Sequence, residues 1–152
     1  MQYLLYIRAM VSHFNNPKII RCEKIPGVVQ LDLYDNGIIE MNWSHELDII
    51  QKDHLVLVKQ LVEIIGEGKK CPVFVATFNF LNITEDAKKY AASDDAQEFT
   101  LANAVLIDNL GKKLMFNFFV ALNKPKTPTK GFITKEKAID WLLWISDKNK
   151  PG

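Results

Sequence analysis

The chain has 152 residues, of which 48% are hydrophobic and 24% are charged, which fits a single folded domain and excludes an intrinsically disordered chain. Nineteen Lys and Arg residues face eighteen Asp and Glu residues, and this formal net charge of +1 gives no reason to expect binding to nucleic acid or to an anionic membrane. Two cysteines are too few for a disulfide framework and indicate a reducing compartment.

The first 17 residues differ in pattern from the rest, and we do not expect them to be a signal peptide. Arg8 interrupts their apolar run, and no small-residue cleavage site follows. No apolar run approaches the roughly 18–20 residues that a membrane span needs. We therefore expect a cytoplasmic protein with an N-terminal appendage over residues 1–17 and a single domain over residues 18–152.

The domain opens with the period of β-strands. A short strand is predicted over residues 19–25, and alternating apolar residues predict two more over 29–34 and 39–43. Asp35-Asn36-Gly37 lies between the last two, and Asn-Gly is the strongest short signal for a hairpin turn. We therefore expect an antiparallel hairpin at the start of the domain.

Helices and strands then alternate. Apolar residues at helical spacing predict a helix over 48–65, and a continuous apolar run predicts a strand over 73–78 that is buried on both faces. Thr84 begins the next helix. Further helices are expected over 95–101, 112–122 and, capped by Thr134, 135–146, with strands over 104–107 and 131–133. This order predicts an α/β fold, with a mixed, mostly parallel sheet of about five strands and helices packed against it.

A set of short stretches carries a family resemblance: Lys70-Cys71-Pro72-Val73, Ile83-Thr84-Glu85-Asp86-Ala87, Tyr90-Ala91-Ala92-Ser93, Asn117-Phe118-Phe119, Asn123-Lys124-Pro125 with Pro128-Thr129, Phe132-Ile133-Thr134, and Ala138-Ile139-Asp140-Trp141-Leu142. Together they resemble a bacterial family of small uncharacterised domains related to STAS domains and to the SEC14 lipid-binding fold. The resemblance implies a STAS-like fold and little about activity.

STAS domains include the anti-sigma-factor antagonists, in which a phosphorylatable Ser begins the helix after the central strand. Thr84 stands at about that position. The family's Asp-Ser-Ser-Gly motif is absent, because the chain reads Asn82-Ile83-Thr84-Glu85 there. Glu85 and Asp86 would repel a phosphate placed beside them. We interpret Thr84 as a helix cap.

The residue types that commonly perform catalysis show no spacing typical of an active site. His13, His45 and His54 form no metal-binding motif, and Cys22 and Cys71 are isolated, so we expect no metal and no cofactor. This counts against a zinc-dependent nucleotide hydrolase of the GTP cyclohydrolase kind. The sequence also lacks a GxSxG elbow and a glycine-rich phosphate loop. We therefore name no catalytic residue and favour a non-enzymatic domain.

The predicted binding site is the sheet edge at the carboxyl ends of the strands, where parallel α/β sheets bind ligands. Its side chains would be amides and hydroxyls with one carboxylate, namely Thr77, Asn79, Asn82, Thr84, Asp108 and Asn109. The alternative is an enzyme site assembled here from Thr84, Asp108 and a histidine.

The predicted helix over 112–122 is apolar nearly all round, although a helix on a sheet needs only one apolar stripe. We predict that Phe116, Phe119 and Val120 form the interface of a homodimer. Two alternatives are that residues 1–17 cover this face, or that it lines an apolar pocket. Residues 105–152 also carry nine lysines against four acidic residues, which would suit an acidic partner.

Three functions stay open. The preferred one is a STAS-like regulatory or interaction domain that binds a protein partner or a small ligand. The alternatives are a small enzyme on the same scaffold and a carrier of a lipid or apolar metabolite. A pocket lined by Phe116 or Phe119 would favour the carrier, whereas a flat apolar patch would favour the protein partner.

Overall fold

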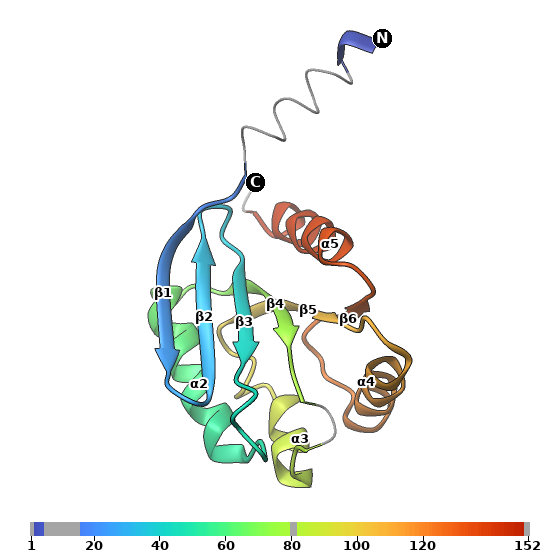
Figure 1. The fold of residues 1–152 in the computed structure, drawn as a ribbon. Helices are drawn as coiled ribbons and strands as arrows, with labels where there is room; N and C mark the ends of the chain where they lie inside the picture. The colour runs from blue at the N-terminus through green and yellow to red at the C-terminus, as the bar shows by residue number, and fades with distance from the viewer. Residues whose placement is uncertain (1, 5–15, 80–81, 151–152) are drawn as a thin grey trace.

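The computed structural model describes residues 2–4, 16–79 and 82–150. In this part of the chain six strands form one sheet in sequence order (Figure 1). They are β1 (Ile19–Ile25), β2 (Val29–Tyr34), β3 (Ile39–Trp43), β4 (Cys71–Thr77), β5 (Thr100–Leu106) and β6 (Thr129–Phe132). Strands β1 to β3 are antiparallel neighbours, and β3 to β6 run parallel. The predicted mixed, mostly parallel α/β sheet is confirmed, with six strands in place of five.

The predicted hairpin between β2 and β3 is also confirmed. Gly37 has φ 87°, in the left-handed region that glycine adopts without steric cost. The Asn36 side chain accepts a hydrogen bond from the backbone N–H of Ile38 at 3.1 Å. The turn residues therefore form the connection that their sequence predicts.

Four helices connect or follow the strands: α2 (Lys52–Ile65), α3 (Glu85–Ala91), α4 (Leu110–Asn123) and α5 (Lys135–Lys148). Thr84, Asn109 and Thr134 cap the last three, each accepting a backbone N–H three residues further on. Helix α2 begins four residues later than predicted, because Ile50 pairs with Ile83 in an isolated parallel bridge and keeps the preceding chain extended.

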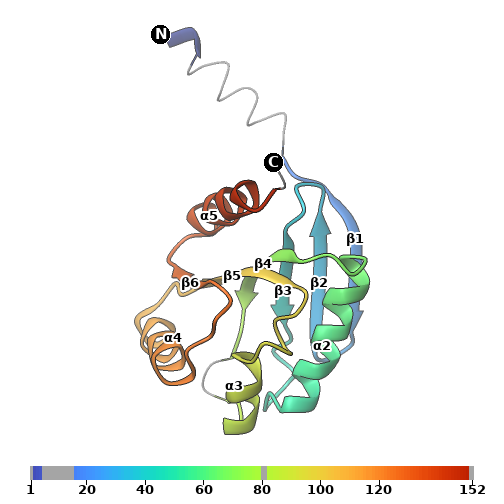
Figure 2. The same cartoon turned by 180° about the vertical axis from the view of Figure 1, so that it is seen from behind.

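The helices cover the sheet from both sides (Figures 1 and 2). Helix α5 packs on β4, β5 and β6, where Ala138 and Leu142 meet Phe74, Ala102 and Ala104. On the other face Val58, Val62 and Ile65 of α2 pack against residues of β2, β3 and β4, and Phe116 of α4 packs against Val105 and Ile107. The result is a three-layer domain in which the sheet separates two cores.

The predicted helix over residues 95–101 is wrong. Residues 92–99 form successive turns, and Thr100 and Leu101 already belong to β5. Ser93 Oγ accepts the backbone N–H of Ala96, and Lys59 of α2 binds the carboxylates of Asp95 and Glu98. These side-chain contacts hold the turns in place, and the segment does not continue as a helix because Thr100 pairs with Cys71 in the sheet.

Two further expectations concern the N-terminal residues and membrane-spanning helices. The predicted appendage over residues 1–17 falls mostly outside the described residues, which include only 2–4, 16 and 17 of it. In the described ranges, no helix is both long enough and apolar enough to cross a bilayer.

Candidate functional site

A cavity of about 340 Å³ lies between the sheet and helices α2, α3 and α4. Its central walls are apolar, with Met41, Val75 and Val105 from the sheet and Val58 and Phe119 from the helices. Helix α3 packs against α2 and, to a smaller extent, against α4, and no described strand is among its main neighbours. Space therefore remains beneath α3, and its volume is in the range of small-molecule sites.

The mouth of the cavity lies between α3 and α4. Glu85 and Lys89 on α3, and Phe118 and Leu122 on α4, line the cavity and are also exposed to solvent. Lys88 lines the same side and pairs with Glu85 at 3.0 Å. A molecule entering here would pass between a charged helix face and an apolar one.

The two ends of the cavity differ in polarity. Trp43, Phe78 and Ile83 line the end near the carboxyl ends of β3 and β4. Polar side chains line the opposite end, near the starts of β5 and β6 and the end of α4: Gln97, Thr100, Asn103, Asn123 and Thr129. The strand register supports this assignment, because Thr100 pairs with Cys71 and Asn103 with both Val73 and Thr129.

Hydrogen bonds fix the amides at the polar end. Asn103 Nδ2 donates to Gln97 Oε1 at 2.7 Å, and Gln97 Nε2 donates to the carbonyl of Ala91 at 2.8 Å. Asn123 Nδ2 donates to the carbonyl of Phe119 at 3.2 Å. Since these bonds set the direction of each amide before a ligand arrives, the polar end is preorganised.

Trp43, at the apolar end, has an indole N–H that no described residue accepts. Its side chain is 5% exposed, and its indole ring meets the Phe78 ring edge-on at 5.7 Å between centroids. The buried indole Nε1 has no hydrogen-bond partner in the described part of the chain. An unpaired buried N–H costs about 1–3 kcal/mol, which is more typical of functional sites than of ordinary cores.

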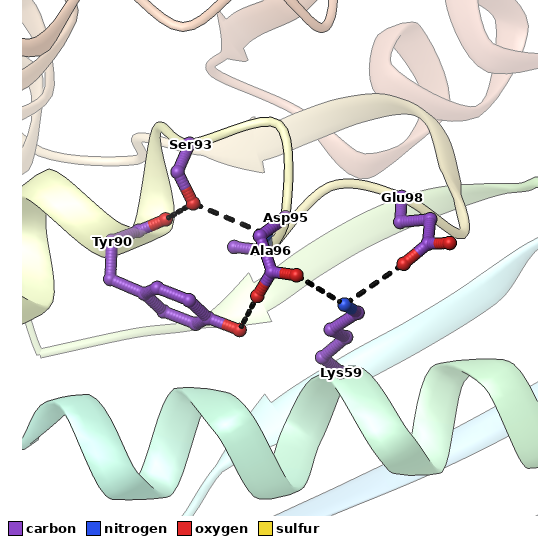
Figure 3. Close-up of polar contacts among 6 residues, drawn as sticks. All are labelled: Lys59, Tyr90, Ser93, Asp95, Ala96 and Glu98. Carbon is purple, nitrogen blue, oxygen red and sulfur yellow. Dashed lines mark hydrogen bonds and ion pairs between the residues drawn. The ribbon is translucent and has the colours of Figure 1, made fainter.

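A polar cluster holds the 92–99 loop against α2, beside the cavity (Figure 3). Lys59 Nζ, on a residue that also lines the cavity, lies 2.9 Å from carboxylate oxygens of both Asp95 and Glu98. The Tyr90 hydroxyl donates to Asp95 at 2.8 Å. Hydrogen bonds from Lys59 and Tyr90 lower the pKa of Asp95, and burial together with the bond to Asp95 raises the pKa of Tyr90 to about 12. At neutral pH Asp95 and Lys59 therefore keep their charges and Tyr90 keeps its proton.

The six residues predicted as the binding site all lie at the expected sheet edge, but none of them lines the cavity. Thr84 and Asn109 cap helices, and Asp108 pairs with Lys112 at 2.9 Å. The Thr77 hydroxyl donates to the carbonyl of Trp43 at 3.1 Å. The remaining two, Asn79 and Asn82, are exposed. The structure thus gives four of these side chains structural roles, and the cavity extends from this edge along the sheet toward the starts of β5 and β6.

The residues predicted as a homodimer interface lie on the inner side of α4. Phe116 is 6% exposed and lines the cavity with Phe119, while the half-buried Val120 packs against the same core. The exposed apolar side chains of α4 form a different row, with one member per turn: Leu110, Leu114, Phe118 and Leu122. Of the alternatives considered for this helix, the arrangement agrees with an apolar pocket.

The described residues offer little for metal or thiol chemistry. Across residues 16–79 and 82–150 no three His, Cys, Asp or Glu side chains are grouped so that they could hold a metal ion. Cys71 is buried, and burial raises the pKa of its thiol. This cysteine is therefore a packed residue with little thiolate character.

Sequence reasoning missed the polar end of the cavity. Asn103 lies within the otherwise apolar strand Thr100–Leu106, and a polar residue in such a run was the available signal. The incorrect helix over 95–101 concealed it, because it placed Gln97 and Thr100 in a helix and not beside Asn103. Their approach to Asn103 depends on the turns of residues 92–99.

Comparisons with known proteins give a family and no activity. A search of curated proteins and a search of solved structures each returned no significant match. A family model matches residues 33–145, which run from β2 into α5 and include every residue named above as lining the cavity. This match does not mention STAS domains, so that relationship stays a prediction. The chain belongs to the family described as Domain of unknown function (DUF7793).

Proposed function

We propose that this protein binds a small, largely apolar molecule in the cavity between the sheet and helices α2, α3 and α4. The observation that carries the proposal is the cavity itself, about 340 Å³ in volume and lined by Phe116 and Phe119. A well-formed apolar cavity with a few convergent polar groups is the usual form of a small-molecule site.

The protein acts in this proposal by binding and not by catalysis. The polar residues of the cavity wall are mainly amides, hydroxyls and lysines, and Glu85 at the mouth is its one acidic side chain in the described part. General acid–base catalysis needs a titratable group positioned at the reacting atoms. The lining favours a carrier or a ligand-sensing domain. A cytoplasmic location and a STAS-like relationship belong to the same proposal and rest on sequence features.

The test is titration with N-phenyl-1-naphthylamine, an uncharged probe whose fluorescence rises in apolar surroundings. We expect saturable binding with one site per chain. Ala91→Phe adds a ring at a lining residue and should weaken binding at least 10-fold. The control Ala121→Phe places the same ring on an exposed position of α4 outside the cavity and should bind like the unmodified protein. Absence of probe binding, or equal binding by both variants, would overturn the proposal.

A second candidate function, self-association into a homodimer, is favoured by the exposed row on α4. Leu110, Leu114, Phe118 and Leu122 are 71%, 50%, 61% and 78% exposed and follow one another at four-residue spacing. Such a row suits antiparallel packing against the same row of a second copy, because a two-fold axis brings identical surfaces together.

Light scattering coupled to size exclusion tests the homodimer. We expect a dimer mass for the unmodified protein and a monomer mass for Leu114→Glu, a residue that does not line the cavity. Ile133→Glu, at another exposed apolar position outside α4, should remain dimeric. A monomer at all concentrations up to about 100 μM, where a weak dimer with Kd near 1 μM would be almost fully formed, would exclude this candidate.

A further inference from the structure

We infer that the cavity selects a ligand with an uncharged hydrogen-bonding head group, such as an amide or an alcohol, on an apolar body. The head group would lie at the polar end, against Gln97, Thr100 and Asn103, and the body would extend toward Trp43 and Phe78. This inference rests on the proposed function and names the class of ligand that the same cavity takes.

The first support is the kind of polar group at that end. The polar side chains lining it in the described part are three amides and two hydroxyls, with no carboxylate among them. An amide both donates and accepts hydrogen bonds. After its bond to Gln97, the Asn103 side chain retains one N–H and its carbonyl oxygen among the described residues, and this pair matches another amide or a hydroxyl.

The second support is that Lys59, a charged residue of the cavity wall, is already paired. Lys59 lines the cavity, but its ammonium lies 2.9 Å from Asp95 and 2.9 Å from Glu98. Two carboxylates on one ammonium leave no net positive charge to pair with an anionic head group. Lys89, which is exposed, stands at the mouth and not at the polar end.

The third support is the cost of burying a charge. An ionised head group that leaves water without a partner of opposite charge loses its hydration, and this loss far exceeds that of an amide or a hydroxyl. Amides that are held by their own hydrogen bonds compensate an uncharged head group well and a full charge poorly. The cavity should therefore discriminate by charge at equal body size.

Three probes with the same eight-carbon chain test this selection. Octanamide, octanoate and octylammonium, each below its aggregation concentration at pH 7.5, compete with bound N-phenyl-1-naphthylamine. We expect octanamide to displace the probe at a concentration at least 10-fold lower than either charged competitor. Asn103→Leu should remove this preference while probe binding persists, and Thr100→Val, a nearly isosteric change, should reduce it. The control Asn117→Leu changes an exposed amide outside the cavity and should keep the preference.

The outcomes separate this inference from the proposed function. Failure of the naphthylamine probe to bind overturns both. Probe binding with equal or stronger displacement by octanoate or octylammonium overturns the selection and leaves the cavity as a binding site. Probe binding without displacement by octanamide, or a preference that survives in both Asn103→Leu and Thr100→Val, also overturns the selection alone.

Discussion

Helices cover the two faces of the sheet in different ways. On the α5 face, Ala102, Ala104, Ala138 and Leu142 are all fully buried, and the helix lies close to β4 and β5. On the opposite face, α2 covers the hairpin side and α4 the β6 side, while α3 bridges the two helices. Small residues allow a helix to approach a sheet closely, whereas a helix supported by other helices leaves space beneath it. The cavity is thus a consequence of how α3 is supported.

This difference indicates a division of roles. On the α5 face, closely packed residues stabilise the domain. On the cavity face, the side chains that line the cavity lack packing contacts that would otherwise add stability. Stability and binding therefore depend on different sides of one sheet, and substitutions can address them separately.

The largest expected effect is on stability from truncation of the α5 core. Leu142→Ala removes a fully buried side chain and should lower the free energy of unfolding by about 2–5 kcal/mol. The same substitution at Leu55, which is partly buried and lines the cavity, should cost less than half as much, because one side of Leu55 already lacks packing partners. Urea denaturation of both variants measures the difference. Equal losses would contradict the contrast between the two faces.

A smaller loss of stability is expected at the β6 side of the cavity face, where the residues are closely packed. A Cβ added at Gly131 would lie 2.6 Å from Ile107 Cδ1 and 3.1 Å from the Phe116 ring. Gly131→Ala should therefore cost about 1–3 kcal/mol of unfolding free energy by overpacking. Gly111→Ala, in the first turn of α4, would meet only Asn109 Oδ1 at 3.4 Å and should be neutral or stabilising. A neutral Gly131→Ala would show that the Ile107 and Phe116 side chains can shift without cost, and would contradict close packing at this margin.

The smallest effect is the pH dependence of the polar cluster that holds residues 92–99. Because bonds from Lys59 and Tyr90 lower the pKa of Asp95, its stabilising contribution is present above the ordinary carboxyl pKa and is lost as the pH falls through the lowered pKa. Asp95→Asn should therefore lower Tm at pH 7 and narrow the difference in Tm between pH 7 and pH 3. The exposed control Asp140→Asn should leave that difference unchanged. An unchanged difference in Asp95→Asn would mean that the cluster does not stabilise the native loop.

Local sequence was a good guide to most elements and a poor guide to the site. The hairpin at Asn36 and Gly37 and the caps at Thr84 and Thr134 are local interactions, and each formed where the sequence predicted. Residues 95–101 failed as a helix because Thr100 pairs with Cys71 in the sheet and the backbone N–H of Cys71 donates to the carbonyl of Phe99, and these contacts join segments distant in sequence. A contact of that kind has no local pattern.

The candidate site could be predicted only in part. The apolar residues of α4 drew attention to this helix, and Phe116 and Phe119 do line the cavity, whereas most of the remaining apolar side chains form the exposed row. The general rule for parallel sheets led instead to three residues with structural roles. Thr77 donates to the carbonyl of Trp43 on the neighbouring strand, Thr84 caps α3, and Asp108 pairs with Lys112. That rule assumes helices packed directly on the sheet, and α3 is not packed in this way.

The sequence by itself determined the α/β class, the opening hairpin and the capped helix starts, because periodicity and capping act over a few residues. Only the tertiary structure decided that α3 stands off the sheet, that a cavity opens beneath it, and that Gln97 and Asn103 meet at one end of that cavity. The physical reason is that a cavity is defined by the relative positions of elements distant in sequence. Those positions depend on how all the helices pack at once.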